Sequence, residues 1–424
     1  KDIIKFLDFK WDDNYNIPTF LNKTIKSQNI IGNIIDKKEN LGLMPSLINK
    51  LNLKYNLLKS KYFETANISQ SNITYIDDTY STDKIKSEDI SVVVQGDVSD
   101  KKEVKNNLKK IRKYLPEAEI ILSTWEKSNV DKLDYDILVS SRDPGAFDMQ
   151  PVTWKINNVN RQIISTINGI KKAKRKYVLK LRTDCLIKNS NFLKYFNSKY
   201  VNDLKRVKEY SVFKNRILID SLFTRNSEYD SCTQVGLCFH PSDIWMFGLK
   251  EDLEMLFDIP LQDKYIVNIN GRDYQYRTPE QYIWTSCLEK NNWNIFMDSC
   301  FYNTPYTSEG SLNSIINNFF VLNHNKSGIK FPKKFRKHPK LTFKYVLTTK
   351  RYLELYKEYN DSSYKIPKEF KYETLSDIFG VNKYIAELKD LLKPFNFIVK
   401  IPMCIIKILL KCITNSYKLI WWLK

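Results

Sequence analysis

The sequence predicts an α/β protein with a mostly parallel sheet flanked by helices, and with helical additions at its N-terminal and C-terminal ends. Between residues 90 and 181, short β-branched or apolar runs alternate with segments whose apolar residues recur at helical spacing. This alternation is typical of a parallel sheet whose strands are joined by crossover helices. Three of the predicted strands end in polar residues, and ligands bind beyond the C-terminal ends of strands in such sheets.

The first strand begins where the character of the chain changes, at Ile90. ISVVVQGDV is a compact β-branched run that ends at Gly96 and Asp97, the pattern of a buried strand leading into a functional turn. The following stretch, DKKEVKNNLKKIRKYLP, carries apolar residues at helical spacing and closes at Pro116. We therefore predict a strand and a helix in immediate succession.

The next elements repeat this pattern. AEIILSTW (118–125) and YDILVSS (135–141) are predicted strands, VNRQIISTINGIKKAKRK (159–176) is a predicted amphipathic helix, and YVLKL is the strand that follows it. Further along, RTPEQYIWTSCL predicts a helix with Thr278 as N-cap and Pro279 at its first position.

The chain is strongly basic, which favours anionic partners. Lys and Arg number 68 against 48 Asp and Glu, a net charge of +20, so nucleotides, lipid phosphates and nucleic acid all suit it as ligands. A compositional preference for Lys accounts for part of this excess. Each Arg is then more informative, because its planar fork matches phosphate and carboxylate groups.

Three strand ends supply the candidate ligand-binding residues. They are Gln95-Gly96-Asp97, the stretch from Ser140 to Gly145 that contains Asp143, and Arg182-Thr183-Asp184. A carboxylate at the tip of a buried strand, such as that of Asp184, can bind a hard divalent ion that bridges nucleotide phosphates. The alternative is that Asp184 only caps a turn.

Several pieces in order, SVVVQG, IRKYLPEAEIILSTWE, NVNRQI, GIKKAKRKYVLKLRTD and RTPEQYIW, resemble the WavE family of lipopolysaccharide and capsule biosynthesis proteins. The resemblance covers roughly residues 88–330. It implies a GT-A-like glycosyltransferase domain, in which a DxD motif after the fourth strand binds a metal ion and the donor diphosphate. Arg182 stands here at the place of the first Asp, so Mn²⁺ or Mg²⁺ is an uncertain cofactor and Arg182 can neutralise the diphosphate directly.

The resemblance also assigns further donor-site residues. Asn160 and Arg161 would lie near the donor phosphates at a helix N-terminus. Gln95, Asp97 and Asp143 would contact base and ribose. For each of these residues the alternative is an ordinary role in a helix cap, a turn or a surface ion pair.

An inverting transferase needs a base for the acceptor hydroxyl, and Glu280 at the start of the predicted helix is the first candidate. Arg277 beside it is assigned to the donor site, and Asp243 in HPSDIWMFG is the second candidate base. His324 is a candidate late metal ligand, although a lone loop His is usually incidental. Glu280 and Asp243 also have simple capping explanations.

We predict four regions: an N-terminal helical extension (1–87), the transferase domain (88–330), a basic Tyr-rich helical region (331–384) and an amphipathic tail (385–424). In the tail, lysines spaced 7, 7, 4 and 7 residues apart form one stripe on a helix, and they are Lys393, Lys400, Lys407, Lys411 and Lys418. The uncharged gaps are too short to span a bilayer, which indicates a helix lying on an anionic membrane surface. Docking on a partner or on the protein's own core is the alternative.

The leading hypothesis is a cytoplasmic glycosyltransferase, peripherally attached to the inner membrane. It would move sugar from a nucleotide-sugar donor to a glycan or lipid-linked glycan acceptor. Seven scattered cysteines with no CxxC spacing fit a reducing compartment. The alternatives are a sugar-phosphate or nucleotidyl transferase on a similar fold and a non-catalytic basic protein that binds membrane or nucleic acid. Nucleic acid is not an expected partner, because no nucleic-acid motif is present.

Overall fold

The computed structural model describes residues 74–76, 84–148, 156–196, 201, 203–229, 237–269, 272–332 and 346–371. Its centre is a seven-stranded sheet with the strand order β14-β10-β11-β7-β2-β3-β4. Strand β11 is antiparallel to both of its neighbours, and the remaining neighbours pair in parallel. The predicted α/β class with a mostly parallel sheet is confirmed. Most of the predicted N-terminal extension, the amphipathic tail, and residues 333–345 and 372–384 of the 331–384 region lie outside the described residues.

The strands of the central sheet are short, and all except β4 are largely buried. In chain order the strands are β2 (Ile90–Gln95), β3 (Glu119–Trp125), β4 (Ile137–Ser141), β7 (Tyr177–Arg182), β10 (Ile217–Asp220), β11 (Trp245–Leu249) and β14 (Phe319–Leu322). Four antiparallel pairs lie outside this sheet: β1 (Tyr75–Ile76) with β9 (Arg206–Val207), β5 (Phe147–Asp148) with β6 (Ile156–Asn157), β8 (Leu186–Ile187) with β15 (Ile329–Lys330), and β12 (Ile266–Ile269) with β13 (Arg272–Gln275).

Helices connect and cover these strands. The described α-helices are α5 (Lys101–Tyr114), α6 (Val159–Lys172), α7 (Asn191–Phe196), α9 (Lys250–Phe257), α10 (Pro279–Lys290), α11 (Pro305–Asn318), α13 (Thr349–Tyr359) and α14 (Lys368–Lys371). Short 3₁₀ helices are η3 (Ser87–Asp89), η4 (Lys208–Tyr210) and η5 (His324–Lys326).

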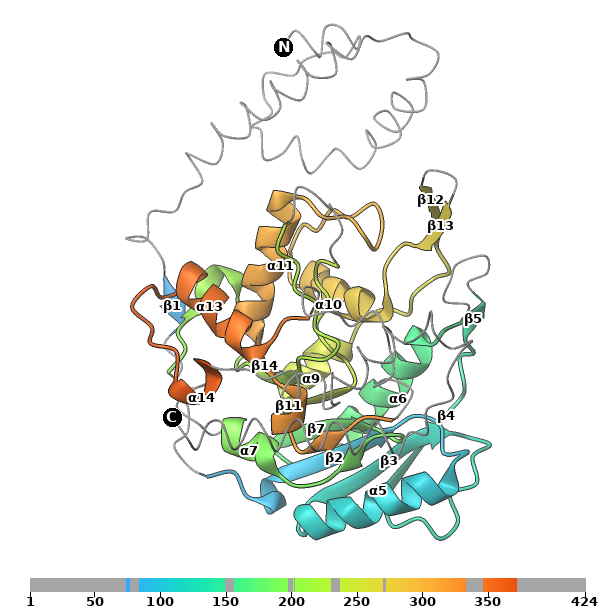
Figure 1. Ribbon diagram of the computed structural model, residues 1–424. Helices are drawn as coiled ribbons and strands as arrows, with labels where there is room; N and C mark the ends of the chain where they lie inside the picture. The colour runs from blue at the N-terminus through green and yellow to red at the C-terminus, as the bar shows by residue number, and fades with distance from the viewer. Residues whose placement is uncertain are drawn as a thin grey trace, which may run out of the picture.

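The sheet is covered on both faces. Helix α6 packs on β2, β3 and β4, and α9 packs beside it on β7 and β11. Helices α5 and α7 lie on the other side of the sheet, so that α6 and α5 sandwich its parallel half (Figure 1). This layered arrangement leaves the C-terminal ends of β2, β3, β4 and β7 at one edge, next to the start of α6.

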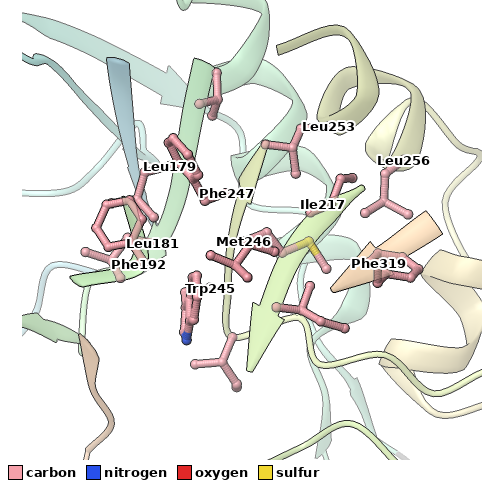
Figure 2. Packing of buried hydrophobic residues seen from close by; sticks show 14 of the residues in the cluster. Leu179, Leu181, Phe192, Ile217, Trp245, Met246, Phe247, Leu253, Leu256 and Phe319 are labelled. Carbon is pink, nitrogen blue, oxygen red and sulfur yellow. The ribbon is translucent and has the colours of Figure 1, made fainter. Parts of the chain in front are cut away.

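Aromatic side chains fill the core between β7, β11 and α7. The ring of Phe247 lies 5.0 Å from that of Phe192 and 4.9 Å from that of Phe196, measured between centroids. Figure 2 shows Phe192, Trp245 and Phe247 beside Leu179 and Leu181 of β7. Burial of such large apolar side chains is the main stabilising term for the sheet.

The predicted elements of the first half are confirmed with small changes at their ends. The main difference is that α6 ends at Lys172, although residues 159–176 were predicted as one helix. The physical reason is that two sheet side chains accept hydrogen bonds from the backbone after Lys172. Glu119 accepts from the N–H of Lys174, and Ser91 accepts from the N–H of Arg175, so these groups bond to the sheet and not along the helix. A buried hydrogen bond from Ser91 to Glu119, at 2.6 Å, holds the two side chains together.

Gly169 allows α6 to approach the sheet closely. A Cβ atom at this position would lie 2.4 Å from Val93 Cγ1 and 3.2 Å from Ser123 Cβ. We expect Gly169→Ala to lower the free energy of unfolding by about 1–3 kcal/mol, because overpacking forces neighbouring atoms to move. Chemical denaturation followed by circular dichroism measures this change.

Gly310 in α11 provides a matched control for this prediction. A Cβ atom there would make only an ordinary contact, 3.7 Å from the Phe239 ring. Gly310→Ala should therefore leave stability unchanged or raise it by up to about 1 kcal/mol, since Ala has the better helix propensity. Equal effects of the two substitutions would contradict the close approach of α6.

Candidate functional site

A pocket of about 610 Å³ lies at the C-terminal edge of the parallel strands. Its walls come from the ends of β2 and β7, the loop after β4, and the first turns of α6 and α5. Most of the predicted donor-site residues line it: Gln95, Gly96, Asp97, Asp143, Arg161, Arg182, Thr183 and Asp184. Three polar clusters that are separated in sequence are thus brought together at one edge.

The turn after β2 lines this pocket. Gly96 has a φ of +120°, a backbone conformation that favours glycine, and a Cβ atom there would lie 3.3 Å from Thr183 Oγ1. The backbone N–H of Thr183 donates to the carbonyl of Gln95 at 3.0 Å, which joins the ends of β2 and β7. Gln95 is fixed in turn by Ser165 of α6, whose hydroxyl donates to its amide oxygen at 2.7 Å.

Arg182 and Asp184 form a bidentate ion pair on the pocket wall. Arg182 Nε and Nη2 donate to the two carboxylate oxygens of Asp184, each at 2.9 Å. Burial opposes the charged form of Arg182, but the hydrogen bonds to Asp184 outweigh it and raise the pKa of the guanidinium. Arg182 therefore keeps its positive charge in a fixed orientation beside the pocket, and the carboxylate of Asp184 balances that charge.

A second bidentate pair joins Arg161 of α6 to Asp143. Arg161 Nε and Nη2 donate to the Asp143 carboxylate at 2.7 and 2.6 Å, and Nη1 donates to Asn158 at 3.0 Å. The hydrogen bonds from Arg161 lower the pKa of Asp143 below its usual value. Asn158 is the N-cap of α6 and also lines the pocket, so the positive end of this helix dipole lies at the same place.

Two predicted donor residues lie elsewhere. Asn160 exchanges hydrogen bonds with the backbone of Gln262, at 2.9 and 2.8 Å, and is buried. Arg277 precedes α10 and donates hydrogen bonds to two side chains of that helix, Glu289 at 2.8 Å and Thr285 at 2.8 Å. Neither residue lines the pocket.

The two candidate bases lie in one buried polar cluster beside the pocket. Glu280 is in the first turn of α10, between Thr278 and Gln281, which form a capping box. Burial raises the pKa of Glu280, while the charges of Arg225 and Arg182 oppose this. Burial also raises the pKa of Asp243, and the nearby charge of Glu280 adds to the effect. Arg182 thus belongs to the pocket wall and also influences the candidate base.

Sequence reasoning missed several members of this cluster. Lys180 is fully buried in β7 and donates to the backbone carbonyl of Asp243, and burial lowers its pKa to about 8. Gln162 donates to the Asp243 carboxylate at 2.7 Å and lines the pocket. His240 Nε2 lies 3.4 Å from Glu280 Oε2. Lys180 had a sequence signal, because it interrupts the apolar run of β7.

The described residues do not fit a divalent ion held by protein side chains alone. Both oxygens of Asp184 accept from Arg182. His324 lies at the start of η5, where its Nδ1 is 3.0 Å from Asp220 Oδ2, and that oxygen also accepts from Trp245 Nε1 at 2.9 Å. Across the part of the chain that the structure describes, no group of three His, Cys, Asp or Glu side chains could hold a metal ion.

A second pocket of about 780 Å³ adjoins the first. The two share Asp97, Ser99, Trp125 and Asp143, and the second extends along the ends of β3 and β4 past Lys101 and Arg142. Trp125 at the end of β3 lies between them. Together the pockets form an extended groove, and the aromatic side chain of Trp125 lines both parts of it.

Comparison with known proteins identifies a family and shows likeness to solved structures. No curated protein matches the chain. A crystal structure of S. aureus TarS, residues 1–349, is similar over 67% of this chain and 76% of that chain, at 12% identity and a TM-score of 0.25.

The family match is more extensive and agrees with the resemblance seen in the sequence. A family model described as WavE lipopolysaccharide synthesis matches residues 90–384. This range contains the whole central sheet, both pockets and the buried cluster around Glu280. The chain belongs to the WavE lipopolysaccharide synthesis family.

Proposed function

We propose that this protein is a GT-A-type glycosyltransferase that moves a sugar from a nucleotide-sugar donor to a lipid-linked glycan acceptor in lipopolysaccharide or capsule synthesis. Membership of the WavE family supports a transferase acting in surface-glycan synthesis. The observation that carries the proposal is the pocket in which Arg161, Arg182 and the N-terminus of α6 converge.

These groups suit the diphosphate of an activated sugar. Two guanidinium groups, each oriented by a carboxylate, present planar donors to phosphate oxygens, and the helix N-terminus adds backbone N–H groups. Asp97, Asp143 and Trp125 line the adjoining groove, where ribose and nucleobase would lie. The same positive charges would stabilise the nucleoside diphosphate as it leaves.

Glu280 is proposed as the general base for the acceptor hydroxyl. A carboxyl whose pKa is raised by burial is better matched to proton abstraction near neutral pH than an exposed one. Its electrostatic coupling to Arg182 supports a place beside the donor site. Asp243, which is buried in the same cluster, is the second candidate for this role.

We propose that arginine side chains supply much of the positive charge that a metal ion supplies in DxD enzymes. The support for this is the ion pair between Arg182 and Asp184, which occupies both oxygens of the carboxylate. Donor binding should therefore persist in a chelating buffer.

Attachment to the cytoplasmic face of the inner membrane remains part of the proposal. Its support is the lysine stripe of residues 393–418, which lies outside the described residues. Among the described helices, none has the length and apolar character needed to cross a bilayer.

A thermal-shift screen with UDP-, GDP-, CMP- and ADP-sugars, with and without Mn²⁺, tests the proposed function. We expect one nucleotide class to raise the melting temperature, since a ligand at 100 times its Kd adds about 2.7 kcal/mol of stability. The shift should survive EDTA. No response to any nucleotide sugar, together with steeply salt-dependent affinity for DNA or RNA, would favour a basic binding protein instead. Release of pyrophosphate rather than nucleoside diphosphate during turnover would favour a nucleotidyl transferase.

A further inference from the structure

The contact between Glu280 and His240 determines where the protons of the buried cluster can lie. His240 Nε2 is 3.4 Å from Glu280 Oε2, and both side chains are mostly buried, with 4% and 16% of their surfaces exposed. The other ring nitrogen, Nδ1, lies 3.0 Å from the backbone carbonyl oxygen of Phe223. A carbonyl oxygen can only accept a hydrogen bond, so Nδ1 carries a proton.

This assignment leaves Nε2 without a proton whenever the imidazole is neutral. The surroundings favour the neutral form, because burial and then the charge of Arg225 lower the pKa of His240 to about 3. An unprotonated Nε2 facing a carboxylate oxygen would set two lone pairs against each other. A proton between them removes this repulsion, and burial already raises the pKa of Glu280.

We propose that Glu280 and His240 share one proton, which rests on Glu280 and moves to His240 Nε2 when Glu280 acts on the acceptor hydroxyl. This inference rests on the proposed function for its role in catalysis, but not for the existence of the shared proton. His240 acts through Glu280 and is a positioning residue. A separation of 3.4 Å is long for a hydrogen bond, as catalytic contacts often are before the substrate binds.

The Glu280 Oε2–H bond breaks and the Nε2–H bond of His240 forms, which leaves a carboxylate beside an imidazolium. The carboxylate takes the proton of the acceptor hydroxyl while the acceptor oxygen bonds to the sugar carbon. The bond from that carbon to the diphosphate oxygen breaks, and its electron pair leaves with the nucleoside diphosphate. One proton passes to solvent when the products depart.

Neighbouring charges act on both members of the pair. Arg225 and Arg182 favour the carboxylate form of Glu280, and Asp243 opposes it. On His240, Arg225 opposes the charged form and Asp243 favours it. Once Glu280 is ionised, its own negative charge adjacent to Nε2 favours the imidazolium. The protons therefore titrate as properties of the pair and not of either residue alone.

Infrared spectroscopy tests the shared proton without any substrate. The difference spectrum between the full-length wild-type chain and Glu280→Gln near neutral pH should contain the C=O stretch of a protonated carboxylic acid. Buried Asp243 is present in both proteins, so its bands cancel to first order. A difference spectrum containing only carboxylate bands would overturn the proposal, whatever reaction the protein catalyses.

The pH dependence of turnover tests the transfer to His240. Gln at position 240 can keep a hydrogen bond to Glu280 but cannot accept a proton. In His240→Gln, Glu280 must lose its proton to solvent, and its raised pKa means that the base form appears only at higher pH. The acid limb of the kcat profile should therefore move upward by about one pH unit or more. An unchanged midpoint in a variant with a wild-type melting temperature would show that His240 only positions Glu280.

Discussion

The Glu280→Gln variant will bind the donor about as tightly as the wild-type protein and transfer sugar about 10²- to 10⁴-fold more slowly. Gln keeps the size and polarity of the side chain in the first turn of α10, but it cannot take a proton from the acceptor hydroxyl. The loss should appear in kcat, because the base acts only as the hydroxyl attacks. Release of nucleoside diphosphate in the presence of a lipid-linked glycan measures it.

Glu254→Gln is the control for this experiment. Glu254 lies on α9, where it forms a half-exposed pair with Lys250 and lines neither pocket, so its neutralisation should leave kcat unchanged. Asp243→Asn should be measured in parallel, because Asp243 is the second candidate base. A Glu280→Gln variant with near-normal turnover, combined with an inactive Asp243→Asn, would transfer the role of base to Asp243.

Replacement of Arg182 by Gln should raise the Kd for the nucleotide-sugar donor about 10- to 100-fold. Hydrogen bonds to a charged group contribute about 1.5–3 kcal/mol, and every 1.4 kcal/mol is a factor of ten in Kd. Arg182→Lys should lie between the variant and the wild type, since Lys keeps the charge but loses the bidentate fork. Isothermal titration calorimetry with the donor found by thermal shift measures these constants.

Arg112 supplies a matched control for the loss of an arginine ion pair. Its side chain is 27% exposed, the same fraction as that of Arg182. Arg112 pairs with Asp136 at a distance of 2.7 Å, and neither residue lines the pocket. Arg112→Gln should leave the donor Kd unchanged. If both substitutions weaken binding equally, the effect comes from loss of stability and not from contact with the diphosphate.

Local patterns in the sequence were sufficient to predict the sheet and its ligand-binding edge. β-branched runs and helical spacing are properties of neighbouring residues, so β2, β3, β7 and α5 could be predicted without tertiary information. Parallel strands necessarily bring their C-terminal ends together. The convergence of Gln95 and Arg182, which are paired in register, follows from that rule.

The buried cluster could not be predicted, because its contacts join distant segments. Lys180 and the carbonyl of Asp243 are 63 residues apart in the chain, and only the packing of β11 against β7 makes them neighbours. Asn160 illustrates a second limit. It is adjacent to Arg161, but successive residues of a helix point about 100° apart, so Arg161 reaches the pocket while Asn160 faces Gln262.

The most direct measurement is a crystal structure of the full chain with the nucleoside diphosphate whose sugar conjugate gives the largest thermal shift. We predict that the diphosphate lies in the pocket at the ends of β2 and β7, contacting Arg161, Arg182 and the first turn of α6, with the nucleobase toward Trp125. A nucleotide bound at another surface, with this pocket untouched, would contradict the account.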